Sequence, residues 1–324
     1  MQYKLWSKLV VSLIAVCVVA IYGINFLVDP YGDREILCEN IYKPVLNERA
    51  KKYNYIFYDK NIEKYDSLIL GSSRVMKIAP SHTTEGKFYN FGVHVANNTE
   101  KLFLIQEWIK RKPLKKIYFG IDFYNFHNKK SQLTLNKNKF QEQYSHNYFS
   151  IETLKMSSKT LKYSLNNTPQ VFFKDDGELV YFENDTMIKN GSFDFSDTKY
   201  LQEAQQNYQN NYLKDKFEIE YNVFETLKKV KEICSENNIE LYVFITPSHT
   251  SDIKKVTADL ELNNKFDTIR AHLREIFGTV YDFSLESPEN NDNKNFYDVH
   301  HYRTNLGDKI LNTLKQPKFN KGNN

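Results

Sequence analysis

The chain opens with a long run of apolar residues. The run extends from Leu9 to Val28 without a charged residue and is followed by Asp29. About 20 apolar residues are enough for a helix to cross the hydrocarbon core of a bilayer. Because the run is apolar on all sides, it lacks the one-sided pattern of a helix that covers a soluble core. Residues 1–28 are therefore predicted to form a transmembrane anchor with a short cytoplasmic N-terminus.

The charges beside this run determine its expected orientation. Lys4 and Lys8 precede it, and the positive-inside rule assigns the basic end of a span to the cytoplasm. A cleaved signal peptide is the alternative, but the run has no clean A-x-A-like site, since Ala20-Ile21-Tyr22 matches it poorly. We expect a single-pass protein of the cytoplasmic membrane, with its N-terminus inside and the residues after 28 outside.

Short apolar runs alternate with amphipathic stretches over the rest of the chain. Near-continuous apolar runs are typical of strands in a parallel sheet that helices cover on both faces. The alternation predicts an α/β fold, a flavodoxin-like three-layer arrangement around a parallel sheet of about five strands. The expected strands are residues 67–70, 87–91, 116–121, 240–245 and 278–283, and the expected helices are residues 97–112, 217–237, 266–276 and 304–314, with helical spacing also around 45–57.

The alternation is interrupted between the third and fourth expected strands. Residues 123–216 are rich in Asn, Lys, Tyr and Phe and contain a candidate hairpin at 171–182. We interpret this segment as an insertion or cap over one end of the sheet. The expected organisation is an anchor at 1–28, a connecting segment at 29–65, an α/β domain at 66–318 that includes the insertion, and a tail at 319–324.

Composition narrows the classes of partner. The chain has 44 Lys and Arg against 40 Asp and Glu, a net charge of +4. No basic stripe stands out along an element, so we expect no nucleic-acid partner. Of the three cysteines, Cys17 lies in the apolar run, and none has a metal-binding spacing. Cys38 and Cys234 are interpreted as separate buried thiols, with a disulfide between them as the alternative.

Residues that follow the expected strands are the first candidates for a site, because ligands of open α/β sheets bind at the carboxyl ends of the strands. Ser73 follows the first strand and Gly71. A serine on such a tight turn has an exposed hydroxyl, and its own N–H can point toward a developing oxyanion. The alternative role of a Gly-Ser-Ser turn is to cap a helix.

Asp298 and His301 supply what a nucleophilic serine needs. The hydroxyl becomes reactive once a base takes its proton, and the base needs an acid that holds its tautomer. The two residues stand at the start of the last expected helix, where a capping Asp with surface histidines is the alternative. Two motifs in the expected order along the chain favour a Ser-His-Asp site, in which His300 is the less suitable base.

We expect no metal or other cofactor at this edge of the sheet. A cluster of His94, Asp122 and His249 is the alternative, since each follows an expected strand. Its spacing matches no known ligand pattern.

The order Gly71-Ser72-Ser73 after the first strand and Asp298-x-x-His301 before the last helix resembles the SGNH (GDSL-type) hydrolase superfamily. The resemblance implies that Ser73 is the nucleophile, His301 the base and Asp298 the residue that orients the base.

Two other sequence blocks of that superfamily correspond less well. Spacing within its second block assigns an oxyanion-binding backbone N–H to Val95 rather than to Gly92. Its third block has an Asn that donates to the oxyanion, and Asp122 stands at that place. An ionised carboxylate cannot donate, so Asn125 or another donor replaces it, the oxyanion hole has two members, or activity is weak or absent. Arg74 is expected to pair with a carboxylate or to steady an anionic substrate.

A closer resemblance is to membrane-anchored SGNH-like proteins that serve cell-envelope polysaccharides, including the teichoic-acid D-alanyl transfer protein and alginate-type O-acetylation proteins. The shared features are the anchor, Asp29-Pro30-Tyr31, the Gly-Ser-Ser block and the terminal 298–303 segment. The resemblance implies transfer of an acyl group, expected to be acetyl, to or from such a polysaccharide, beside a multi-pass membrane acyltransferase as partner. A carbohydrate esterase with the same site and a non-catalytic polysaccharide-binding scaffold are the alternatives.

Overall fold

The computed structural model of the chain describes residues 2–31, 48–58, 61–128, 147–165, 171–181, 206, 209–210 and 217–315. The chain divides into two compact units. The anchor unit comprises Met1–Lys51, Asn136–Phe172 and Val180–Lys189, and the sheet unit comprises Lys52–Leu135, Phe173–Leu179 and Asn190–Asn324. The predicted tail at 319–324, Cys38 and much of the predicted insertion lie outside the described residues.

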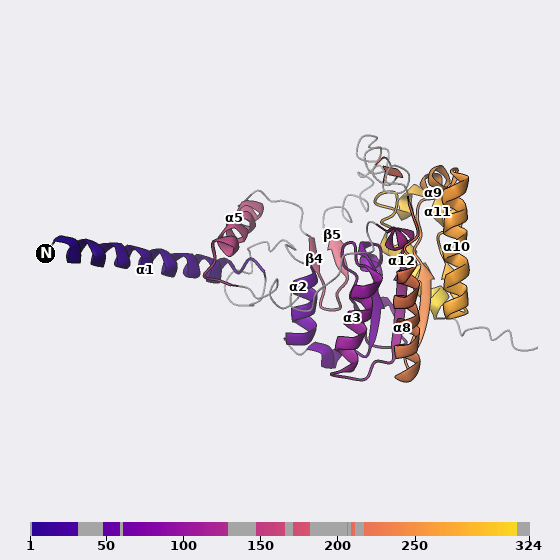
Figure 1. Ribbon diagram of the computed structural model, residues 1–324, viewed down its shortest axis with the longest axis horizontal. Helices are drawn as coiled ribbons and strands as arrows, with labels where there is room; N and C mark the ends of the chain where they lie inside the picture. Colours follow the sequence, from indigo (N-terminus) through magenta and orange to yellow (C-terminus); the bar gives the residue numbers. More distant parts are fainter. Residues whose placement is uncertain are drawn as a thin grey trace, which may run out of the picture. The chain divides into compact units, whose positions relative to one another are not determined.

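The first helix of the anchor unit, α1 (Gln2–Val28), is long and apolar enough to cross a membrane (Figure 1). Its apolar side chains point outward, and Leu9 and Val19 keep 62% and 69% of their surface exposed. A helix of a soluble core would bury such side chains. The exposure therefore leaves a membrane span or a signal sequence as the interpretations of α1.

A second helix of the anchor unit, α5 (Ile151–Leu165), packs against α1. Asn25 of α1 is fully buried, and its Nδ2 donates to the carbonyl oxygens of Tyr148 at 2.7 Å and Ser150 at 3.2 Å. The apolar pattern did not predict α5 within the segment interpreted as an insertion. The reason is that its buried positions are polar: Thr153, Ser157 and Thr160.

Five parallel strands form the sheet of the other unit, in the order β2-β1-β3-β6-β7. This confirms the predicted α/β class and the parallel five-stranded sheet. Three predicted strands match to the residue, and the second and fifth are shorter than expected. The strands are β1 (Ser67–Leu70), β2 (Phe88–Asn90), β3 (Lys116–Ile121), β6 (Glu240–Ile245) and β7 (Val280–Asp282).

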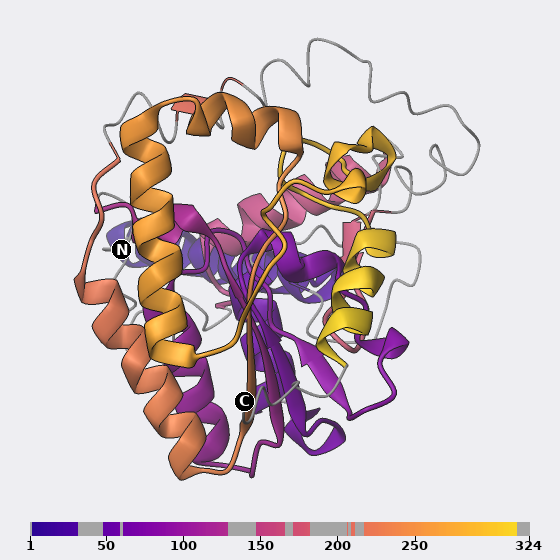
Figure 2. The same cartoon turned by 90° about the vertical axis from the view of Figure 1, so that its right-hand side faces the viewer.

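Helices cover both faces of this sheet, which makes three layers (Figure 2). On one face lie α3 (Asn98–Ile109), α8 (Asn222–Glu236) and α10 (Leu260–Phe277). On the other face lies α12 (Thr304–Leu314). The core between α12 and the sheet contains Ile69 of β1, Tyr118 of β3, Phe244 of β6, and Leu306, Ile310, Leu311 and Leu314 of α12.

Local signals explain where these helices begin and end. Asn97 caps α3 by accepting from the N–H of Glu100 at 2.8 Å, and Asp259 caps α10 by accepting from the N–H of Leu262 at 3.0 Å. Gly278 ends α10 with a positive φ of 74° that other residues rarely adopt. The helix predicted at 304–314 matches α12. α10 begins earlier than the predicted 266, because Asn263, Asn264 and Lys265 interrupt the apolar pattern of its first turns.

The remaining elements are short. β4 and β5 pair as the hairpin that was predicted at 171–182. Cys234 of α8 is a buried free thiol whose pKa burial raises to about 12. The short elements are α2 (Glu48–Tyr53), the π-helix η1 (Asn54–Tyr58), η2 (Asn61–Lys64), η3 (Ser73–Lys77), η4 (Pro80–His82), η5 (Phe123–Phe126), β4 (Val171–Phe173), β5 (Leu179–Tyr181), α9 (Thr250–Thr257), α11 (Pro288–Asn291) and η7 (Asn293–Asn295).

Candidate active site

Ser73 begins a 3₁₀ turn directly after the carboxyl end of β1. Ser72 caps this turn, because its Oγ accepts from the backbone N–H of Arg74 at 3.2 Å. Ser72 is completely buried and Ser73 is half-buried. The two serines of the motif therefore have different roles: Ser72 holds the turn, and Ser73 presents its hydroxyl at the edge of the sheet.

Three glycines surround the side chain of Val75, two residues beyond Ser73. A Cβ on Gly71, Gly92 or Gly120 would come within 2.5, 2.7 and 2.7 Å of a Val75 methyl group, respectively. These glycines lie at or just after the ends of three neighbouring strands, β1, β2 and β3. The close approach seats the turn of Ser73 on the sheet. This role was not predicted from the sequence, although glycine is sparse in the chain and each of these glycines follows an apolar run or lies near its end.

Asp298 organises the second half of the site in the loop before α12. One carboxylate oxygen, Oδ1, accepts from the backbone N–H groups of His300 at 2.9 Å and His301 at 2.8 Å. The other, Oδ2, lies 2.7 Å from Nδ1 of His301. Because a carboxylate with both oxygens engaged by donors is held in one orientation, the same residue shapes the loop and aims the imidazole.

His301 connects Asp298 with Ser73. Its Nε2 lies 2.8 Å from Ser73 Oγ. An ionised carboxylate only accepts hydrogen bonds, so Nδ1 of a neutral His301 carries the proton and donates to Asp298. Nε2 then has the lone pair that accepts from the Ser73 hydroxyl. The structure thus brings Ser73, His301 and Asp298 together in the arrangement that a serine nucleophile with a general base requires.

His300 takes a different place from its neighbour. Its Nδ1 lies 3.8 Å from Asp298 Oδ1, and its ring centroid is 4.3 Å from that of His301. Burial, together with the charge of His301, holds the pKa of His300 well below its ordinary value. Burial opposes ionisation of Asp298, but the charges of both histidines and their hydrogen bonds hold the pKa of its carboxyl well below the usual range. Asp298 is therefore ionised at neutral pH.

Arg74, which follows Ser73 in the chain, forms a buried ion pair with Asp122. Arg74 Nε lies 3.3 Å from Asp122 Oδ1, and their side chains are 5% and 0% exposed. Nη1 of Arg74 donates to the hydroxyl oxygens of Thr246 and Ser248, each at 3.2 Å, and Thr246 also donates to Asp122. The carboxylate at the place of the expected Asn is thus engaged with Arg74 and Thr246 and does not reach the surface.

Asn125 and Val95 lie in adjoining turns of the same edge. Asn125 is buried, and its Nδ2 donates to the carbonyl oxygen of Ala96 at 3.0 Å. Val95 has a φ of 53°, a left-handed conformation that is strained for a β-branched residue. The side-chain amide of Asn125 is therefore engaged with the loop that carries Val95.

Two buried lysines that sequence reasoning did not single out hold the loops of this edge. Lys52 is 1% exposed and donates from Nζ to the carbonyl oxygens of Asn90, Gly92 and Gly177, at 2.8, 2.7 and 2.8 Å. A buried ammonium is stable only when its donors are satisfied. Lys52 therefore ties the loop after β2 to the turn of the β4–β5 hairpin. No local pattern around Lys52 could have shown partners so far along the chain.

Lys101 of α3 is the second buried lysine. Its Nζ donates to the carbonyl oxygen of Gly120 at 2.8 Å and to Asn98 Oδ1 at 3.1 Å. Burial lowers the pKa of Lys101 to about 8, although the charges of Asp122 and Glu100 act in the opposite direction. Lys101 links the start of α3 to the end of β3, close to the glycines that seat Val75.

The residues considered for a metal do not form one cluster. Asp122 is engaged with Arg74 as described, and His249 pairs through Nδ1 with Ser251 Oγ at 2.8 Å. Among the described residues, the side chains whose ligand atoms lie close enough for an ion are Asp298, His300 and His301, within 4.8 Å of one another. Both ring nitrogens of His301 are engaged in the hydrogen bonds to Asp298 and Ser73.

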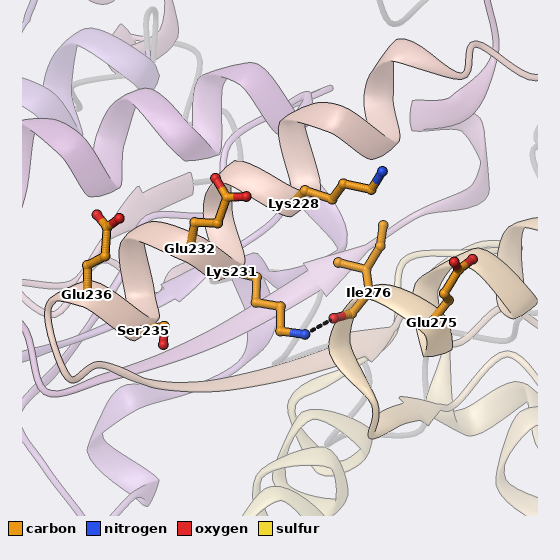
Figure 3. Close-up of a pocket in the computed structure, with 7 residues that line it drawn as sticks. All are labelled: Lys228, Lys231, Glu232, Ser235, Glu236, Glu275 and Ile276. Carbon is orange, nitrogen blue, oxygen red and sulfur yellow. Dashed lines mark hydrogen bonds between the residues drawn. The ribbon is translucent and has the colours of Figure 1, made fainter.

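A groove of about 480 Å³ lies at the opposite edge of the sheet, between the ends of α8 and α10 (Figure 3). These helix ends directly precede the amino ends of β6 and β7. Lys231 of α8 donates to the carbonyl oxygen of Ile276 across the groove. Its other lining residues are exposed charged side chains and one serine: Lys228, Glu232, Ser235, Glu236 and Glu275.

Comparison with known proteins adds no family name to this geometry. No protein-family model matches the chain, and no curated protein matches it significantly. The chemistry of the edge that carries Ser73, His301 and Asp298 therefore has to follow from the arrangement of its own side chains.

Proposed function

We propose that the chain transfers an acyl group to or from a cell-envelope polysaccharide through an acyl-serine intermediate on Ser73. The observation that carries this proposal is the continuous chain of hydrogen bonds from Ser73 Oγ to His301 at 2.8 Å and from His301 to Asp298 at 2.7 Å. It lies at the carboxyl edge of a parallel sheet, where such folds bind ligands. The polysaccharide and the acyl group, acetyl, follow from the resemblance to membrane-anchored SGNH-like proteins.

In the first step Ser73 becomes acylated. Nε2 of His301 takes the hydroxyl proton as Oγ attacks the carbonyl carbon of the acyl donor, and Asp298 stabilises the imidazolium that forms. The tetrahedral intermediate collapses when the bond to the donor oxygen breaks. That oxygen leaves with the proton from Nε2, so the donor departs as an alcohol and the acyl group remains on Oγ.

In the second step a new nucleophile takes the acyl group. His301 removes a proton from a polysaccharide hydroxyl, whose oxygen attacks the acyl carbon, and Ser73 regains its proton as the bond to Oγ breaks. If water attacks instead, the same site is a carbohydrate esterase. Which of the two reaches the acyl-serine decides between transfer and hydrolysis.

The oxyanion of each intermediate needs donors. We propose a hole made of backbone N–H groups, those of Ser73 and Val95, in place of an Asn side chain. In support, the carboxylate of Asp122 is buried against Arg74 and Thr246. A negative charge that is neutralised in this way does not oppose a developing oxyanion as a bare carboxylate would.

The proposed location is the cytoplasmic membrane, with α1 as a single-pass anchor, the N-terminus inside and the sheet unit outside. Tyr3 and Tyr22 stand about 28 Å apart along α1 at 1.5 Å per residue, close to the thickness of a hydrocarbon core. Asn25 and Asp29 at the end of α1 are hydrogen-bonded to Tyr148, so the helix end is part of the folded protein. A multi-pass membrane acyltransferase is the proposed partner that supplies the acyl group.

The test is acyl release by the full-length protein in detergent, with the acetyl ester of p-nitrophenol as substrate, with and without an oligosaccharide acceptor. Ser73→Ala is expected to abolish release and the acetyl adduct that mass spectrometry finds on the Ser73 peptide. Ser235→Ala, which removes an exposed serine from the groove at the opposite edge, is the matched control and should leave both unchanged.

The outcomes separate the three functions. Release that the acceptor accelerates, with acetylated sugar as product, supports transfer. Release that the acceptor does not change supports an esterase. Equal release by the Ser73→Ala protein, with no adduct on the unmodified chain, would contradict both enzymatic functions and favour the non-catalytic scaffold.

A further inference from the structure

The outer face of α5 has two flanks that differ in chemistry. With 100° between successive residues of an α-helix, Leu154, Leu161 and Leu165 fall within a sector of about 40°. Leu161 and Leu165 are 36% and 83% exposed. The three residues lie beside the polar stripe of Thr and Ser that packs on α1, so an apolar flank of α5 continues from the α1–α5 contact toward the solvent.

A stripe of lysines forms the other flank. Lys155, Lys159 and Lys162 fall within a sector of about 60° by the same geometry, and all three are exposed. The one acidic residue of α5 is Glu152, whose carboxylate lies 3.4 Å from Lys155 Nζ. Among its own residues, α5 therefore has three lysines against one glutamate, and the lysines lie directly beside the apolar flank.

Side-chain contacts hold α5 beside the last turns of α1. Asn25 of α1 holds the residues just before α5, and Ser157 in the middle of α5 donates to Asn25 Oδ1 at 2.8 Å. Tyr22 of α1 stacks on Phe149 with ring centroids 4.5 Å apart. If α1 spans a membrane, its last turns lie at the headgroup level, where aromatic side chains collect. α5 then lies at that level too.

We propose that α5 is an interfacial helix that binds anionic lipid headgroups on the outer surface of the cytoplasmic membrane. This inference rests on the proposed anchoring of α1. The apolar flank, extended by Phe149 and Ile151, which are 58% and 64% exposed, inserts between the acyl chains next to α1. The lysine flank lies at the phosphate level. An interfacial helix has this combination of an apolar side and a basic side, and each lysine near an anionic surface adds favourable electrostatic energy.

The test places nitroxide labels in the full-length chain, in a background in which Cys17, Cys38 and Cys234 are replaced by alanine. The protein is reconstituted in vesicles of phosphatidylcholine with phosphatidylglycerol, and circular dichroism verifies the fold of each variant. Collisions with oxygen report lipid, and collisions with a nickel chelate report water. Labels at Leu161→Cys and Lys159→Cys probe the two flanks of α5, Val16→Cys probes α1, and Glu232→Cys is the aqueous control.

If α5 is an interfacial helix, oxygen collisions should dominate at positions 16 and 161, and nickel collisions should dominate at positions 159 and 232. Lipid contact at 16 combined with water contact at 161 would overturn the inference and leave the anchor intact. Protection of 161 from both reagents would also overturn it, because protein then covers the flank. Water contact at 16 would instead show that the proposed anchoring fails.

The anionic headgroup has its own test. In the Leu161→Cys protein with its lysines intact, the label should lie deeper in vesicles that contain phosphatidylglycerol than in vesicles of pure phosphatidylcholine. Lys155→Glu, Lys159→Glu and Lys162→Glu together should abolish this difference. The control replaces three exposed lysines of the sheet unit, Lys228, Lys229 and Lys255, by glutamate and should retain it. If the label at 161 lies equally deep in both lipids while the lysines are intact, the proposed headgroup preference is wrong.

Discussion

The two edges of the sheet differ in how they hold their charged side chains. The amino edge has a groove of about 480 Å³ lined by exposed charges. Each of these charges can be solvated by water, so none has to be held in one geometry. The carboxyl edge instead combines the half-buried Ser73 and His301 with charged groups that are almost completely buried, such as Arg74 and Asp122.

Buried charges that are paired with one another, rather than the volume of a hollow, therefore mark the edge that carries the candidate site. A charge that leaves water loses several kcal/mol of solvation unless partners replace it. Lys52, Lys101, Arg74 and Asp298 all have such partners, and all lie around the turn of Ser73 or the loop of His301. If this contrast has energetic consequences, substitutions of the buried groups should reduce activity or stability, whereas matched substitutions of exposed charges should not.

The largest effect is expected for the residue that orients the base. Asp298→Asn should lower kcat roughly a thousandfold or more, because an amide at this place favours the tautomer of His301 that cannot accept from Ser73. The measurement is acyl release at neutral pH. Glu236→Gln, an equivalent change in the groove at the amino edge, is the control. A decrease in kcat of less than tenfold in Asp298→Asn would contradict the role of Asp298 in orienting His301.

The next effect concerns the buried ion pair of Arg74 and Asp122. Removing one partner leaves the other charge buried and unpaired, so Arg74→Met and Asp122→Asn should each lower the free energy of unfolding by about 3 kcal/mol. Denaturant titration measures this, and the double variant should lose less than the sum of the two. Glu225→Gln, which removes the exposed partner of Lys228, should cause no measurable change. Additive losses would mean that the pair is not coupled.

The smallest effect is a pH dependence from Lys101. Its pKa of about 8 in the fold lies below the ordinary value of 10.5. Between these values the unfolded chain binds more protons than the folded chain, so the free energy of unfolding rises with pH. From about pH 8 to about pH 9.5 the rise from this group should be on the order of 2 kcal/mol.

The comparison with Lys101→Met isolates this contribution. Burial raises the pKa of tyrosines such as Tyr89, but they are the same in both proteins and their effect cancels in the difference. Lys229→Met removes an exposed lysine of α8 and controls for the loss of one charge. If the free energy of unfolding of the unmodified chain does not rise relative to that of Lys101→Met between these pH values, the ammonium is not buried as the structure describes.

Much of the fold could be predicted from the sequence because its signals are local. Strands at 67–70, 116–121 and 240–245 and the helix at 304–314 follow from apolar periodicity within each segment, and periodicity is decided by residues a few positions apart. α5 was missed for the same reason. Its buried positions are Thr and Ser, whose burial depends on α1, so apolar periodicity does not mark the face of α5 that packs.

The candidate site divides in the same way. The order of the three site residues could be predicted from sequence motifs, as could the position of each after a strand or before a helix: Ser73, Asp298 and His301. His301 rather than His300 was already expected as the partner of Ser73. The contact itself, 2.8 Å between His301 Nε2 and Ser73 Oγ, required the tertiary structure, because the two residues lie 228 positions apart in the chain.

Only the tertiary structure decided what surrounds these residues. It pairs Asp122 with Arg74, seats Val75 among three glycines and gives Lys52 its carbonyl partners. Each of these contacts joins residues from different strands or loops, and a buried charge or a close packed methyl group is stable only when all of its neighbours are in place at once. A local pattern cannot encode such a condition, because it concerns distances between segments rather than spacing along the chain.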